Sequence, residues 1–211
     1  MSVGRLCGLT AVLFFPLFLF QGRPGAPEFW WWLALNISVC SAAGAYNNGP
    51  FREHLKQDLS GDLARKVLLG LASAGFLYLV FYFGNLISRY LFSWAGAGIN
   101  NVYAFKGGAS AWRIGLLMAL VIGPGEEILW RVLIQGGLEK KTGPFSGFIL
   151  ATGLYTAVHL ASFNLMLVLA AGLCGLFWGW LYYRFRSPLL NIVSHTLWDL
   201  SVFLLFPFNA G

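Results

Sequence analysis

The chain has 211 residues, of which 58% are hydrophobic, 17% aromatic and only 10% charged. Soluble domains carry roughly 25% charged residues, so this composition excludes an ordinary soluble protein and favours a polytopic membrane protein. The formal net charge of +6 could suggest nucleic acid as a partner. However, the basic residues lie in short stretches between apolar windows, where they set membrane topology and contact anionic lipid. We therefore expect a lipid bilayer as partner and no nucleic acid.

Seven apolar windows predict an all-α transmembrane bundle of about seven spans, within a range of six to eight. They lie at about 6–21, 28–46, 67–88, 114–137, 145–163, 165–183 and 188–208. We expect one integrated bundle, with N-terminal helices over 1–110 and a second group of helices, which carries the candidate functional residues described below, over 111–211. The fifth and sixth windows are so close together that one of them could be re-entrant.

Basic residues predict the orientation of the chain in the membrane, because short cytoplasmic loops are enriched in Lys and Arg. With the N-terminus inside and seven spans, nine of them fall on the cytoplasmic side: Arg5, Arg52, Lys56, Arg65, Lys66, Lys140, Lys141, Arg184 and Arg186. Four fall on the other side: Arg23, Arg89, Lys106 and Arg113. The sequence therefore predicts a cytoplasmic N-terminus.

Two stretches between the windows have recognisable patterns. Apolar residues recur at every fourth position from Phe51 to Leu63, with charged residues between them. This pattern predicts an amphipathic helix at about 51–65 that lies along the cytoplasmic interface. The Gly- and Ala-rich stretch from Ala95 to Ala111 favours an extracytoplasmic loop, which serves either as a plain connector or as part of a substrate entrance.

Charged residues interrupt the fourth window, where Glu126, Glu127 and Arg131 follow Gly123-Pro124-Gly125. A charged group near the middle of a bilayer costs about 2.5–3.5 kcal/mol, so these residues form either a structural ion pair or a reaction site. Proline and glycine weaken a helix. We therefore expect a break or kink before Glu126, and a restarting helix whose positive end favours both carboxylates.

Helical spacing distinguishes the two glutamates. Glu127 and Arg131 are four residues apart, so they lie on one helix face and can pair. Glu126 is turned away by about 100 degrees and is the carboxylate left free for chemistry. This division of roles predicts that Glu126 is catalytic and that Glu127 and Arg131 are supporting residues.

Other ionisable residues fall in the later windows at the same spacing. Tyr155 and His159 are four residues apart in the fifth window, and His195 and Asp199 are four apart in the seventh. Each pair shares a helix face, and Asp199 could set the tautomer of His195. Intramembrane ionisable groups commonly face the bundle interior and mark a functional site.

A glutamate with histidines around a water suits peptide hydrolysis, in which the carboxylate removes a proton from the water and a donor stabilises the oxyanion. A serine mechanism fits less well, because no Gly-x-Ser-x-Gly elbow is present. Zinc or another divalent metal stays an alternative, with Glu126, His159 and His195 as candidate ligands, although no HExxH spacing occurs.

The three motifs Glu126-Glu127-x-x-x-Arg131, Tyr155-x-x-x-His159 and His195-x-x-x-Asp199 resemble those of the CPBP family of intramembrane proteases. That family includes type II CAAX prenyl endopeptidases and bacterial relatives linked to bacteriocin processing and self-immunity. The resemblance covers about Gly123 to Phe208. It departs from the usual pattern at Tyr155, where Phe is usual, while the position of Asp199 is Asn or Asp in the family.

The resemblance implies that Glu126 is the general base, that His159 helps to activate the water and that His195 with Asp199 stabilises the oxyanion. Members of the family have been described both as metalloproteases and as glutamate-dependent proteases without an obligatory metal, and we favour the second, with no cofactor required. The resemblance also implies a membrane-anchored protein or peptide as substrate and a prokaryotic cell membrane as location. Two alternatives of other classes stay open. One is a non-catalytic immunity or interaction protein, and the other is a small transporter or proton relay, in which the groups would be strung along the membrane normal.

Overall fold

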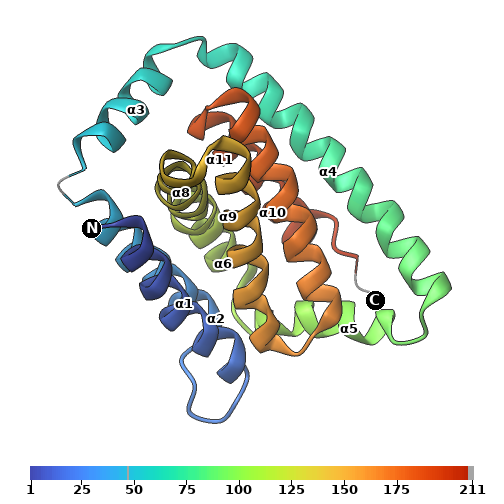
Figure 1. The fold of residues 1–211 in the computed structure, drawn as a ribbon. Coiled ribbons are helices and arrows are strands. Elements are labelled where there is room, and N and C mark those ends of the chain that lie inside the picture. The colour runs from blue at the N-terminus through green and yellow to red at the C-terminus, as the bar shows by residue number, and fades with distance from the viewer. Residues whose placement is uncertain (47, 209–211) are drawn as a thin grey trace.

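The computed structural model describes residues 1–46 and 48–208, and this part of the chain contains helices and no strands. The all-α prediction is therefore confirmed. The α-helices are α1 (Val3–Phe20), α2 (Phe29–Ala45), α3 (Gly49–Ser60), α4 (Leu63–Leu91), α5 (Ala95–Tyr103), α6 (Ala111–Leu117), α7 (Gly123–Glu126), α8 (Gly136–Thr142), α9 (Pro144–His159), α10 (Leu165–Phe185) and α11 (Pro188–Leu200). Figure 1 shows α4 along one flank of the bundle and α5 across the end where the C-terminal residues lie.

Five helical segments are long and apolar enough to cross a membrane: Val3–Phe20, Leu63–Leu91, Pro144–Ser162, Leu165–Phe185 and Pro188–Leu205. Helix α2 is apolar but has 17 residues, slightly fewer than a typical span requires. The remaining apolar window lies in the run from α6 to α8. The chain is thus a multi-pass membrane protein.

The run from Ala111 to Thr142 is helical throughout, which corrects the expected break at Pro124. The junction residues Ile122, Gly123, Glu126 and Glu127 all have right-handed helical dihedral angles. Two π-helical stretches, Met118–Ile122 and Glu127–Gln135, flank the short helix α7. The change of hydrogen-bond register accommodates Pro124, because the amide of Gly123 donates to the Met118 carbonyl five residues back. No helix restarts here, so no positive helix end faces the glutamates.

The glycines beside Pro124 serve close packing instead. A Cβ atom on Gly123 would lie 2.3 Å from Thr196 Oγ1 of α11, and one on Gly125 would lie 2.3 Å from Ile37 Cγ2 of α2. Neither distance is tolerable for a real side chain. The Gly-Pro-Gly segment thus lets α2 and α11 pack closely on the helical run from Ala111 to Thr142, which we call the central helix, just before the two glutamates.

Two shorter helices connect the long ones. Helix α3 begins after Asn48, whose side chain accepts the Phe51 amide, and ends at Ser60, earlier than the amphipathic pattern suggested. The stretch after Ala95, expected to be a loop, begins with helix α5 and a short 3₁₀ turn, Ala104–Lys106. The expectation of a loop was wrong here, because the alanines favour a helix and tertiary contacts such as that of Asn164 with Gly98 outweigh the low helix propensity of the glycines.

Helix α10 packs closely on α9 through small residues. A Cβ atom on Gly179 would lie 2.8 Å from the Phe148 ring, and one on Gly175 would lie 3.2 Å from Thr152. The Thr152 hydroxyl also donates to the Gly175 carbonyl at 3.2 Å. This close contact fits the small-xxx-small pattern of interhelical packing in membranes, and it holds the His159 end of α9 against the first turns of α10.

Candidate active site

The two adjacent glutamates lie in different surroundings. Glu126 lines a cavity of about 380 Å³, and one of its carboxylate oxygens accepts a hydrogen bond from the Tyr155 hydroxyl at 3.1 Å. Glu127 is fully buried and does not line that cavity. The helical repeat that separates neighbouring side chains by about 100 degrees accounts for this difference.

Glu127 is the centre of a buried polar network that joins two helices. Its Oε2 atom lies 3.4 Å from Nε of Arg131, one turn along the same helix. From α11, Nδ1 of His195 lies 2.7 Å from Oε1, and the side-chain amide of Asn191 donates to Oε2 at 2.8 Å. Both Glu127 and Arg131 have no exposed surface. A buried carboxylate needs such donors, because without them its desolvation would not be compensated.

His195 faces a carboxylate with each ring nitrogen. Nδ1 contacts Glu127, while Nε2 lies 3.5 Å from Oδ2 of Asp199. The shorter contact is the one to Glu127, so Glu127 sets the ring orientation, a role expected for Asp199. The indole of Trp178 stacks on the imidazole with ring centroids 3.7 Å apart, which limits rotation further. The ring is thereby held with Nε2 at the cavity.

His159 is oriented by its own helix. Its Nδ1 atom lies 2.7 Å from the Tyr155 carbonyl, one turn earlier in α9. If Nδ1 carries the proton, Nε2 is left as an acceptor, and the residue lines the same cavity as Glu126. The Phe18 ring of α1 packs against the imidazole with centroids 4.3 Å apart. The N-terminal half of the chain therefore contributes to the site.

One cavity brings together all four candidate catalytic residues, which are Glu126, His159, His195 and Asp199. Tyr155 also lines it, whereas Glu127 and Arg131 do not. The guanidinium of Arg131 lies over the Tyr155 ring, with its carbon 5.4 Å from the centroid. Two carboxyl groups and two imidazoles from three helical segments thus line one cavity, which is large enough for water and a short stretch of peptide.

Sequence reasoning missed Asn191 and Trp178. Asn191 holds Glu127 and also donates to the Trp178 carbonyl at 2.8 Å, while the Trp178 indole donates to Ser194 at 3.1 Å. A signal for Asn191 was present, because it precedes His195 by four residues and so shares its helix face. Nothing local in the sequence indicated that Trp178 of α10 would stack on His195.

The side chains at the site that could bind a metal ion are those of Glu126, His159 and His195. In the described part of the chain, no group of three or more His, Cys, Asp or Glu side chains is arranged to hold a metal ion. The three candidate ligands, Glu126, His159 and His195, line the cavity without forming such a cluster. Both nitrogens of His195 face carboxylates, with Nδ1 at 2.7 Å from Glu127 and Nε2 at 3.5 Å from Asp199.

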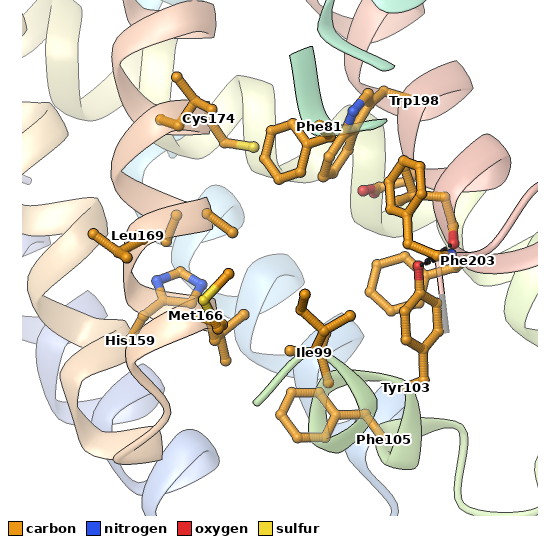
Figure 2. A pocket seen from close by; sticks show the side chains of 18 of the residues that line it. Phe81, Ile99, Tyr103, Phe105, His159, Met166, Leu169, Cys174, Trp198 and Phe203 are labelled. Atoms are coloured by element: carbon orange, nitrogen blue, oxygen red, sulfur yellow. Dashed lines mark hydrogen bonds between the residues drawn. The ribbon is translucent and has the colours of Figure 1, made fainter. Parts of the chain in front are cut away.

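The remaining walls of the cavity are apolar and mostly aromatic. Figure 2 shows His159, Met166 and Leu169 on one side of the cavity, facing Tyr103, Trp198 and Phe203 on the other. Ile99 and Phe105 from the α5 region close one end. A few polar groups in an otherwise apolar concave site are typical of a binding or catalytic pocket.

Comparison with known proteins gives one match. Residues 108–201 match the family model described as type II CAAX prenyl endopeptidase Rce1-like. No curated protein and no solved structure gives a significant match. The matched segment contains all the candidate site residues and runs from just before α6 to the end of α11. Residues 108–201 are thus similar to the type II CAAX prenyl endopeptidases, and this match supports membership of the CPBP family, whose general activity is intramembrane proteolysis of the CAAX type.

Proposed function

We propose that the protein is an intramembrane endopeptidase that hydrolyses a peptide bond of a membrane-associated protein or peptide through water activated by Glu126. The observation that carries this proposal is the shared cavity, in which Glu126, His159 and His195 surround one space. Hydrolysis requires a base, a water-positioning group and an oxyanion donor around one reacting carbonyl.

In the proposed mechanism Glu126 removes a proton from a water molecule as the water attacks the peptide carbonyl. His159 accepts a hydrogen bond from this water through Nε2, because its Nδ1 atom faces the Tyr155 carbonyl at 2.7 Å. The proton taken up by Glu126 then passes to the leaving amine, so that the carboxylate is regenerated.

On the other side of the cavity, His195 donates from Nε2 to the oxyanion that forms on the attacked carbonyl. Glu127 supports this step by accepting from Nδ1, and Asn191 and Arg131 hold Glu127 in place. Asp199, which also lines the cavity, lies 3.5 Å from Nε2. A donor held in place before the reaction stabilises developing charge without reorganisation at that moment.

The same geometry weighs against a proton relay. A relay needs titratable groups strung along the membrane normal, whereas these groups surround a single cavity. The proposed mechanism requires no metal, because Glu126 acts directly on the water. We favour a substrate cut close to the bilayer surface, with no requirement for a prenyl group.

The proposal is tested by comparing the termini of membrane proteins in cells that contain the wild-type protein, the Glu126→Gln variant or neither. Mass spectrometry of these termini should reveal new ends that depend on the wild-type protein and disappear in the variant. If the same ends form with wild type and Glu126→Gln at equal protein levels, Glu126 is not the base. If no new ends depend on the wild-type protein, the alternative of a non-catalytic immunity or interaction protein is favoured.

A further inference from the structure

The two ends of the bundle can be identified from contacts between segments distant in sequence. At one end, which we call the basic end, Asp58 of α3 accepts the Leu189 amide of α11 at 2.7 Å and pairs with Lys66 of α4 at 2.8 Å. Arg186 after α10 pairs with Glu139 of α8 at the same end. The start of α1 also lies there, because a Cβ atom on Gly137 would meet the Val3 side chain at 2.8 Å.

The opposite end, which we call the α5 end, is held by a separate set of contacts. Glu28 before α2 lies 3.6 Å from Arg113 of α6. The Asn164 side chain donates to the Gly98 carbonyl of α5 at 2.8 Å. The Tyr103 hydroxyl donates to the Val202 carbonyl at 2.9 Å, which ties α5 to the end of the last helix. The two ends are thus made of different segments.

The two ends carry different numbers of Lys and Arg residues. The nine basic residues Arg5, Arg52, Lys56, Arg65, Lys66, Lys140, Lys141, Arg184 and Arg186 belong to segments of the basic end. The four at the α5 end are Arg23, Arg89, Lys106 and Arg113. Since Lys and Arg near span ends set orientation, the basic end faces the cytoplasm and the α5 end faces the other side.

The cavity lies in the half of the bundle near the α5 end. Each long helix contributes lining residues from its part near that end, such as Phe18 in the last turn of α1 and His159 at the end of α9. Met166 in the first turn of α10 and Phe208 after α11 also line it. Figure 2 shows the α5 region, with Ile99, directly bordering the cavity.

Packed side chains separate the cavity from the basic end. Gln135, with no exposed surface, donates to the Glu139 carboxylate and to the Gly179 carbonyl, both at 3.0 Å. The neighbouring Ile134 and the large side chain of Trp130 are also fully buried. None of these three side chains lines the cavity. A peptide reaching Glu126 from the cytoplasmic end would have to displace this layer.

The cavity does reach the outer surface between α4 and α10. Gly84 of α4 and Leu169 and Leu173 of α10 line the cavity and are exposed at the surface of the bundle. This face would contact lipid, so a membrane-anchored chain could enter from the side. The described lining residues include no Lys or Arg, and most of them are apolar.

We propose that the substrate is a membrane-anchored protein that is cut on the non-cytoplasmic side, within an uncharged apolar stretch that enters between α4 and α10. This inference rests on the proposed peptide-hydrolase function. It adds the side of the membrane on which the substrate is cut and the apolar character of the segment that enters the cavity. The aromatic walls match apolar side chains beside that bond.

The side of the cavity is tested by cysteine labelling of the full chain in cell membranes. Asn100→Cys on α5 and Gln57→Cys on α3 place a thiol on an exposed residue at each end, and neither residue lines the cavity. A membrane-impermeant maleimide should label Asn100→Cys in intact cells and Gln57→Cys only after permeabilisation. The unmodified chain, with Cys7, Cys40 and Cys174, gives the background. The reverse pattern would overturn the inference.

The side of cleavage is tested separately by locating the termini that depend on wild-type protein and are absent with Glu126→Gln. We expect these ends in protein segments outside the cytoplasm. Ends that lie on the cytoplasmic side would overturn this inference and leave the hydrolase proposal intact. If no terminus depends on Glu126, the hydrolase proposal fails, and with it the substrate assignment, while the labelling result still locates the cavity.

Discussion

The Nδ1 atom of His195 lies 2.7 Å from Oε1 of Glu127, and this contact joins the last helix to the central one across the middle of the bundle. The same carboxylate pairs with Arg131 and accepts the amide of Asn191. In the proposed mechanism Glu127 acts through these residues as a positioning residue, whereas Glu126 lines the cavity.

Replacing Glu127 with Gln should destabilise the protein. The change leaves the buried guanidinium of Arg131 without a counter-charge, and breaking a buried pair in this way costs about 3–5 kcal/mol. We expect less folded protein after detergent extraction and a lower thermal midpoint. The matched control is Glu53→Gln on the exposed face of α3, which should have no effect. A stable Glu127→Gln protein that has lost only activity would instead give Glu127 a direct part in the reaction.

Replacing Asn191 with Ala should weaken both stability and catalysis. The change removes the donor to Glu127 and leaves the buried Trp178 carbonyl without that partner, at a cost of about 1–3 kcal/mol for an unsatisfied group. Because Glu127 orients His195, we expect kcat to fall more than KM changes. Asn101→Ala, an exposed change on α5, serves as control. Unchanged kcat would show that the position of His195 does not depend on Asn191.

Replacing Tyr155 with Phe should leave an active enzyme. The hydroxyl donates to Glu126 at 3.1 Å, but the ring makes the packing contact, with its centroid 5.0 Å from that of Trp130. Phe is also the usual residue here in the family that the motifs resemble. We expect peptide cleavage within about tenfold of wild type, which corresponds to about 1.4 kcal/mol in the barrier. A loss as large as that of Glu126→Gln would place the hydroxyl in the chemical step.

Metal removal should not abolish activity. The proposed base acts directly on water, and the described residues contain no cluster of three or more His, Cys, Asp or Glu groups suited to a metal ion. Purified protein dialysed against a strong chelator should therefore retain its rate of peptide cleavage. Loss of cleavage on chelation, restored by adding zinc, would contradict the metal-free mechanism.

Spacing within a helix predicted much of the site. The four-residue separations of Glu127 from Arg131 and of His195 from Asp199 correspond to contacts of 3.4 and 3.5 Å in the structure. Apolar windows likewise predicted the long helices, because a membrane span needs a nearly continuous apolar run. These features depend on residues close together in the chain, which a single sequence displays directly.

Contacts between helices could not be read in the same way. Nothing in the order of residues placed Glu127 beside His195, because that contact depends on how the central helix and α11 pack. The prediction of a break at Pro124 was wrong for a related reason. Close packing of Gly123 and Gly125 against Thr196 and Ile37 supports a continuous helix, and the π-helical register absorbs the missing amide.

The central claim is that Glu126 activates the water, and its most direct test is the cleavage rate of purified Glu126→Gln in lipid vesicles. The substrate would be a membrane protein whose cleavage depends on the wild-type enzyme in cells. A general base contributes about 10²–10⁴-fold to the rate. We expect a loss of this size with an unchanged thermal midpoint. Cleavage at the wild-type rate by the folded variant would contradict the claim.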